Sequence, residues 1–182
     1  VIEGLKRLEY RGYDSWGIAY KDPLKTDGGL HIEKKVGKIG EALSKNFAKI
    51  TSSLAIGHSR WATHGGVTEK NAHPHFTENR DIALVHNGII ENYEKLRSAL
   101  RSRGHEFISE TDTEVIAHLI EENIHLGLEK STIMACAKLE GRYAVLVISA
   151  KENLMVAARR GSPLIVGIGK NELFIASDIP AF

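Results

Sequence analysis

Strand-like stretches occur in groups along this chain instead of alternating one by one with helices. Short apolar runs bounded by turn residues predict strands, and apolar residues three or four positions apart predict helices. The expected strands are 15–20, 30–36, 54–58, 82–85, 143–148, 154–158, 164–168 and 173–175, and the expected helices are 38–47, 91–103, 111–125 and 132–139. Because successive parallel strands need a crossover helix, this order favours antiparallel sheets packed with helix layers. We therefore expect an α+β fold, not a doubly wound parallel sheet.

The composition is typical of a single globular domain. The 182 residues suit one domain, and 42% hydrophobic and 26% charged residues exclude collagen-like, disordered and disulfide-scaffold proteins. No apolar run reaches the roughly 18 residues that predict a transmembrane helix. The net charge of +1 gives no electrostatic reason to expect nucleic acid or an anionic membrane as a partner. The single cysteine, Cys136, excludes an intrachain disulfide and fits a reducing compartment.

The two ends of the sequence predict a piece of a longer protein. Residue 1 is Val, and apolar residues at positions 1, 2, 5 and 8 have helical spacing with no capping residue before them. The sequence contains no positively charged segment followed by an apolar core, so it shows no signal peptide. An expected strand also lies within a few residues of the last position. We therefore expect that further chain precedes Val1.

A polar loop with an unusual beginning follows the strand at 54–58. Residues 61–79 form a loop longer than about 15 residues, a length usually associated with function or disorder. Arg60, at the strand end, is a planar bidentate donor suited to a carboxylate. Trp61 could cover a small site, with the Gly65-Gly66 pair as its hinge. A surface arginine, a partly buried tryptophan and an ordinary glycine turn are the alternative.

Two further short segments carry groups that could act on a substrate. Asn87-Gly88 is primarily a turn signal, but an Asn amide beside a Gly N–H can also form an oxyanion hole. Asp112, in the segment 110–114, could bind a ligand ammonium or simply favour the positive end of a helix dipole. Thr111 with Glu114 matches a capping box at the start of that helix.

Histidines form a third group, since five of the nine lie between positions 58 and 86. His73-Pro74-His75 has the H-x-H spacing of some metal sites. The acidic and histidine ligands that follow such a motif in metallohydrolases are replaced here by Phe76-Thr77. A stiffened loop whose imidazoles form hydrogen bonds is the alternative, and we expect no bound metal.

Five segments together resemble one family. They read YRGYDS (10–15), RWATHG (60–65), NAHPH (71–75), HNGIIEN (86–92) and SETDTE (109–114). In this order they closely resemble the glutaminase domain of the glutamine–fructose-6-phosphate aminotransferases, a branch of the class II glutamine amidotransferases. The resemblance covers essentially the whole chain, 1–182. The amidophosphoribosyltransferase branch is similar at the Asn-Gly and Asp positions but differs in the Arg-aromatic loop.

The resemblance implies a fold and a set of roles. The fold is the N-terminal-nucleophile hydrolase sandwich, with four layers αββα and two antiparallel sheets between the helices. Arg60 would bind the glutamine α-carboxylate and Asp112 its α-ammonium. The Asn87 side chain and the Gly88 N–H would form the oxyanion hole. The remaining implied site residues are three in the loop that closes over glutamine, and one near the nucleophile: Trp61, Thr63, His64 and Arg11.

The sequence departs from the family at its beginning. The family's nucleophile is a cysteine at the mature N-terminus, whose own α-amino group acts as base. That cysteine, its strand and the sugar isomerase domains are not in this sequence, so we expect the chain as written to bind L-glutamine or L-glutamate without hydrolysing it. Cys136 cannot substitute, because it lies in an apolar helical stretch without an activating neighbour.

The resemblance also implies properties of the whole enzyme. We expect a cytoplasmic, homo-oligomeric enzyme that needs no cofactor and whose isomerase domains receive the ammonia. Three alternatives stay open at this stage. They are the glutaminase domain of another class II amidotransferase, a domain that only binds glutamine or a partner, and a metal-dependent hydrolase using His58, His64, His73 and His75.

Overall fold

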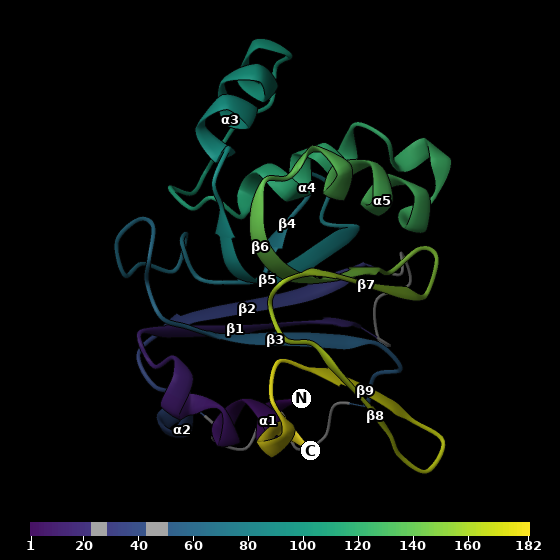
Figure 1. Ribbon diagram of the computed structural model, residues 1–182. Helices are drawn as coiled ribbons and strands as arrows, with labels where there is room; N and C mark the ends of the chain where they lie inside the picture. The colour runs from purple at the N-terminus through teal and green to yellow at the C-terminus, as the bar shows by residue number, and fades with distance from the viewer. Residues whose placement is uncertain (23–28, 43–50) are drawn as a thin grey trace.

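The computed structural model describes residues 1–22, 29–42 and 51–182. Its strands form antiparallel sheets throughout the described residues (Figure 1). The expected turn at 23–29 and the second half of the expected helix at 38–47 fall largely outside the described residues. None of the helices described is long and apolar enough to cross a membrane.

The first sheet has three strands in the order β2-β1-β3. Its strands are β1 (Ser15–Lys21), β2 (Leu30–Val36) and β3 (Ala55–Arg60). Along β1 the side chains alternate between two cores, because successive residues of a strand face opposite ways. Trp16 and Ile18 pack toward α1 (Ile2–Arg7) and α2 (Ile39–Ala42), whereas Ala19 packs toward the second sheet.

The second sheet has four strands in the order β4-β5-β6-β7. Its strands are β4 (His75–Phe76), β5 (Ile82–Ile90), β6 (Gly141–Ser149) and β7 (Leu154–Arg160). On β5, Ile82 and Leu84 pack against the helices, and Ala83 and Val85 pack against the first sheet. Both faces of this strand are therefore apolar, which is why 82–85 reads as a continuous apolar run in the sequence.

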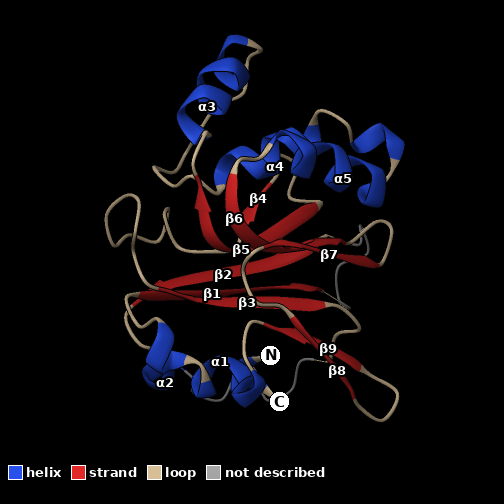
Figure 2. Cartoon of the chain, viewed as in Figure 1, coloured by secondary structure: helices blue, strands red, loops and turns tan. Residues whose placement is uncertain are grey.

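Helices cover the outer faces of the two large sheets (Figure 2). The helices α3 (Tyr93–Ser102), α4 (Glu114–Glu121) and α5 (Leu128–Lys138) lie beyond the second sheet, and α1 and α2 lie beyond the first. Three separate apolar cores fill the interfaces. One lies between the second sheet and its helices, one between the two sheets, and one between the first sheet and its helices. This arrangement confirms the expected four-layer αββα sandwich.

Several details differ from the expectations. β8 (Ile165–Ile168) and β9 (Leu173–Ala176) form a separate two-stranded sheet below the first sheet (Figure 1). The loop at 61–79 contains the short strand β4, and the helix expected at 111–125 divides into α4 and the 3-10 helix η3 (Ile124–Leu126).

The predicted capping box is wrong in its partners. α4 begins at Glu114, and the Thr113 side chain that precedes it makes no cap hydrogen bond. The buried Glu114 carboxylate instead accepts hydrogen bonds from the backbone N–H groups of Ile108 and Ser109, at 2.9 and 2.8 Å, and from the Ser109 hydroxyl at 2.6 Å. Its role is to hold the chain that leads into the helix.

Candidate active site

One cavity of about 530 Å³ collects the side chains that the sequence nominates. It lies where β3, β5, the loop after β3 and the start of α4 meet, and its wall also includes residues of α1 and β9. All eight nominated residues line it: Arg11, Arg60, Trp61, Thr63, His64, Asn87, Gly88 and Asp112. A volume of this size falls in the range of small-molecule sites.

Asn87 and Gly88 lie inside β5 and not in a turn, so the ordinary reading of Asn-Gly does not apply here. Gly88 has φ +123°, a conformation that favours glycine. A Cβ at this position would lie 2.0 Å from the carbonyl oxygen of Arg142 on the neighbouring strand β6. The backbone therefore requires glycine here, next to the Asn87 amide.

His58 positions the Asn87 amide. Its Nε2 lies 2.9 Å from Asn87 Oδ1. Burial lowers the pKa of His58 to about 4, against the opposite effect of this hydrogen bond, so the imidazole is neutral at pH 7. Since an amide oxygen can only accept, Nε2 carries the ring proton and its N–H donates a hydrogen bond to Asn87 Oδ1. The Asn87 NH₂ is then the free end of the amide, as an oxyanion donor requires.

Arg60 ends β3 and is almost completely buried, with 4% of its surface exposed. Its guanidinium donates to the carbonyl oxygen of Gly66 at 3.1 Å and to that of His64. Arg60 thus shapes the loop that follows it in addition to lining the cavity. A buried guanidinium that already makes two hydrogen bonds has further N–H donors for a carboxylate.

Asp112 is also buried, at 4% exposure, just before α4. Its Oδ2 accepts a hydrogen bond from the backbone N–H of Ile90 at 2.8 Å, which links the start of α4 to the end of β5. This contact fixes the carboxylate beside the strand that carries Asn87 and Gly88. The structure therefore places a negative group and a potential oxyanion hole on one wall of the same cavity.

The loop after Arg60 is held by contacts that the sequence did not reveal. The Ala62 N–H donates to Asp14 Oδ2 at 2.9 Å. Further along, Glu110 Oε2 accepts from the Gly66 N–H at 3.1 Å and from the Asn71 side chain at 2.8 Å. Both acids come from distant parts of the chain, so only their positions within the YRGYDS and SETDTE segments could have pointed to them.

The tip of this loop is more exposed than its base. Trp61 is 59% exposed, and its ring packs against Tyr13 with 5.7 Å between centroids. His64 packs edge-on against Tyr93 at 5.2 Å, and its Nδ1 lies 3.4 Å from the Thr63 hydroxyl. An exposed aromatic residue at the mouth of a cavity is suited to cover a bound ligand.

Arg11, in the 3-10 helix η1 (Glu9–Arg11), also lines the cavity. Its guanidinium contacts Asp178 Oδ2 at 3.2 Å and the Ser177 carbonyl oxygen at 3.3 Å. The YRGYDS segment is thereby joined to the chain after β9.

The four histidines of the metal-hydrolase alternative do not appear as a group of possible metal ligands among the residues that the structure describes. His58 and His73 have ring centroids 4.2 Å apart, and His73 and His75 4.9 Å apart, whereas His64 packs on Tyr93 instead. Burial lowers the pKa values of His73 and His75 well below the usual value.

Two imidazoles of the 58–86 group, those of His75 and His86, lie within hydrogen-bond distance of threonines just before α4. His75 Nε2 lies 3.0 Å from the Thr111 hydroxyl, and His86 Nδ1 lies 2.8 Å from the Thr113 hydroxyl. The alternative of hydrogen-bonded interior imidazoles describes these residues.

Cys136 lies on α5 and does not line the cavity. It is half-buried against the helix–sheet core, and so less enclosed than expected. Burial raises the pKa of its thiol. A thiol with a raised pKa, away from the cavity, is a poor nucleophile.

Comparisons with known proteins show the family of the chain. A family described as a glutamine amidotransferase domain matches residues 58–182. The glutamine–fructose-6-phosphate aminotransferase (isomerizing) of Pyrococcus horikoshii is 52% identical, and that of Thermus thermophilus is 51% identical. Each alignment covers 100% of this chain but only 30% of the relative, so the chain spans under a third of those proteins.

Two solved structures have the same fold. One is the glutamine phosphoribosylpyrophosphate amidotransferase from B. subtilis complexed with ADP and GMP, with a TM-score of 0.85 and 32% identity. The other, described as the allosteric regulatory enzyme of purine biosynthesis, gives a TM-score of 0.86 and 32% identity. Each match covers 100% of this chain and 39% of the other.

Proposed function

This chain belongs to the glutamine amidotransferase domain family, and we propose that it is the glutaminase domain, residues 1–182, of an isomerising glutamine–fructose-6-phosphate aminotransferase. In that role it releases ammonia from L-glutamine for the synthesis of glucosamine 6-phosphate, the hexosamine pathway. The identity of about half of all positions to such enzymes supports the assignment. The single observation that carries it is one cavity lined by Arg60, Asp112, Asn87 and Gly88.

In the proposed mechanism the cavity binds glutamine by both ends of its amino-acid group. Arg60 pairs with the α-carboxylate, because its planar guanidinium offers parallel donors in a desolvated setting. Asp112 binds the α-ammonium through its buried carboxylate. These two contacts leave the side-chain amide of glutamine to approach Asn87 and Gly88.

The chemical step needs a nucleophile from the parent chain. We propose that the nucleophile is an N-terminal cysteine upstream of Val1. Val1 itself lines the cavity, so the chain that precedes it can reach the site. Its thiolate attacks the amide carbonyl, and the Asn87 NH₂ and the Gly88 N–H stabilise the oxyanion that forms. The cysteine's own α-amino group takes the thiol proton before the attack and gives it to the departing nitrogen, so ammonia leaves as the tetrahedral intermediate collapses to a thioester. Water then hydrolyses the thioester to glutamate and restores the thiol. Trp61, Thr63 and His64 cover the bound substrate, and Arg11 lies near the nucleophile.

The remaining properties follow from the same assignment. The ammonia passes to sugar isomerase domains of the same parent chain, which bind fructose 6-phosphate. The parent enzyme is a cytoplasmic homo-oligomer without a cofactor in this domain. Neither nucleic acid nor a membrane is a partner.

Kinetics of the full-length enzyme test this proposal. Asn87→Ala should lower kcat for ammonia release by about 10²–10³-fold. Glutamine KM should change much less, since the oxyanion exists only after attack. A normal kcat with a raised KM would instead place Asn87 in substrate binding. Product analysis with fructose 6-phosphate or phosphoribosyl pyrophosphate as acceptor separates the two amidotransferase branches.

A further inference from the structure

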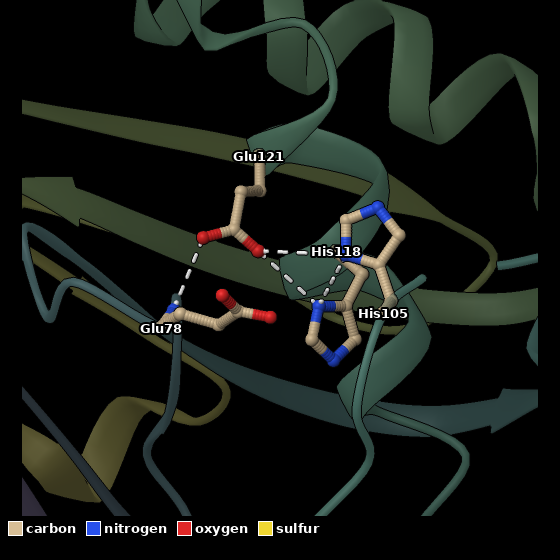
Figure 3. A group of neighbouring side chains, drawn as sticks. All are labelled: Glu78, His105, His118 and Glu121. Carbon is tan, nitrogen blue, oxygen red and sulfur yellow. Dashed lines mark hydrogen bonds and ion pairs between the residues drawn. The ribbon is translucent and has the colours of Figure 1, made fainter. Parts of the chain in front are cut away.

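A second group of metal-ligand side chains lies outside the cavity, on the side of the second sheet that the helices cover (Figure 3). His118 and Glu121 are on α4, His105 is in the segment between α3 and α4, and Glu78 is in the turn between β4 and β5. One ligand atom of each residue lies within 4.8 Å of the ligand atoms of the other three. Three separate parts of the chain thus converge on one point.

The spacing of three of these atoms matches one face of a tetrahedral metal site. His105 Nδ1 lies 3.1 Å from His118 Nδ1. Glu121 Oε2 lies 3.2 Å from His118 Nδ1 and 3.7 Å from His105 Nδ1. Ligands bound at about 2.0–2.1 Å in tetrahedral geometry are about 3.3–3.4 Å apart. The carboxylate of Glu78 points toward the same space and can supply the fourth position (Figure 3).

The outward nitrogens of both imidazoles face carboxylates. His105 Nε2 lies 3.6 Å from Glu122 Oε1, and His118 Nε2 lies 3.9 Å from Glu114 Oε1. A histidine that ligates a metal commonly donates its other N–H to such a carboxylate. With Nδ1 on a metal, each Nε2 carries the proton that this arrangement needs.

His118 is the one buried member of the four. Only 2% of the residue is exposed, and among the described residues its Nε2 has no hydrogen-bond partner. Its Nδ1 faces two groups at once, Glu121 and His105. If Nδ1 of His118 carries a proton, that one N–H has to serve both Glu121 and His105. A cation between the three atoms satisfies all of them.

We propose a binding site for a divalent transition-metal ion, with Zn²⁺ as the best match, formed by four side chains: Glu78, His105, His118 and Glu121. Two imidazole nitrogens and two carboxylate oxygens suit Zn²⁺ better than Mg²⁺ or Ca²⁺, which prefer oxygen ligands only. Glu78 is exposed, so the ion has a route from solvent. The site is structural: it ties the β4–β5 turn to α4, a connection already made by the Glu78 N–H donating to Glu121 Oε1 at 3.1 Å.

Zinc titration of the full-length protein, after treatment with a chelator and desalting, tests the site. A chromophoric chelator in competition measures stoichiometry and affinity. We expect one Zn²⁺ per chain at this site. His105→Gln and Glu78→Gln should each weaken binding at least about 100-fold. Removing a group that only hydrogen-bonds to a metal ligand already costs up to about 100-fold, and each of these variants removes a ligand itself. His125→Gln, an exposed histidine of η3 outside the group, is the matched control and should bind like the parent protein.

A second measurement does not depend on affinity. Co²⁺ bound to the parent protein should give the intense visible absorption of tetrahedral geometry, which His105→Gln should abolish. Circular dichroism checks that each variant is folded. If His105→Gln does not fold, Glu78→Gln, which lies on an exposed turn, still tests the site. Failure of the parent protein to bind Zn²⁺, or unchanged one-to-one binding in folded His105→Gln and Glu78→Gln, would overturn the proposal. Neither result depends on the glutaminase assignment.

Discussion

Replacing His58 tests how the proposed oxyanion hole is held. The His58 Nε2–H donates to Asn87 Oδ1 over 2.9 Å and so determines which end of the amide faces the cavity. We choose His58→Phe, which keeps a planar ring and removes the donor. His58→Gln is the matched rescue variant, because its amide NH₂ can reach the position of Nε2. The full-length parent enzyme is the material for both.

The expected magnitude follows from the bond that is lost. A neutral intramolecular hydrogen bond contributes about 0.5–1.5 kcal/mol net, and about 1.36 kcal/mol is a tenfold change in rate. We expect His58→Phe to lower kcat by up to about tenfold. That is well below the roughly 10²–10³-fold loss expected for Asn87→Ala, because the mutant amide still samples the correct orientation. Glutamine KM should stay nearly constant, and His58→Gln should recover most of the rate.

A double-mutant cycle separates positioning from general damage. Ammonia release is measured for both single variants and for the combination of His58→Phe with Asn87→Ala. If His58 acts only through Asn87, then His58→Phe has little further effect once Asn87 is alanine. Multiplicative losses in the double variant, or a His58→Phe enzyme with normal kcat, would refute this account.

Four other changes have defined outcomes. Arg60→Lys should weaken glutamine binding by about 2–5 kcal/mol, since an ammonium cannot make the paired contact in a buried site; unchanged glutamate affinity by calorimetry would remove Arg60 from the site. Gly88→Ala should lower stability and activity together, because the new Cβ would lie 2.0 Å from a backbone oxygen; an unchanged melting temperature would contradict this. Burial lowers the pKa values of His58 and His86 to about 4. As the pH falls, the unfolded chain therefore binds protons before the folded protein does, and urea titrations should show the free energy of unfolding falling from about pH 6.5 toward pH 4. A constant free energy of unfolding across that range would show that these imidazoles are accessible to solvent. Cys136→Ser should leave ammonia release by the full-length enzyme unchanged, and lost turnover would make this thiol the nucleophile.

Periodicity and turn residues were sufficient for the order of the elements. The strand expected at 30–36 is β2, and the stretch at 15–20 is β1 with one residue added. Local signals determine such elements because alternating or continuous apolar runs reflect which faces are covered. The grouping of strands also predicted antiparallel sheets with helix layers. The side chains of the proposed active site were nominated by resemblance, since each segment alone had an ordinary interpretation.

Only the tertiary structure decided which conformation and which partners those segments have. Asn87-Gly88 reads as a turn, yet pairing with β6 carries the strand through to Ile90. Glu114 reads as part of a capping box, yet its carboxylate is closer to the backbone of Ile108 and Ser109. In the first case pairing with a strand distant in sequence replaces the expected turn. In the second, backbone N–H groups outside the capping-box pattern replace the expected cap contact.

Both proposed features, the oxyanion hole and the metal site, also depend on the fold to bring separate segments together. The hydrogen bond from His58 to Asn87 crosses between the two sheets, from β3 to β5. The proposed metal ligands come from three separate parts of the chain, and only His118 and Glu121 are close together in the sequence. His73-Pro74-His75 has a spacing that metal sites use, yet its His75 Nε2 lies 3.0 Å from the Thr111 hydroxyl in the interior of the protein. A sequence motif records neighbours along the chain, but a site is formed by neighbours in space, and packing of the four layers determines which residues those are.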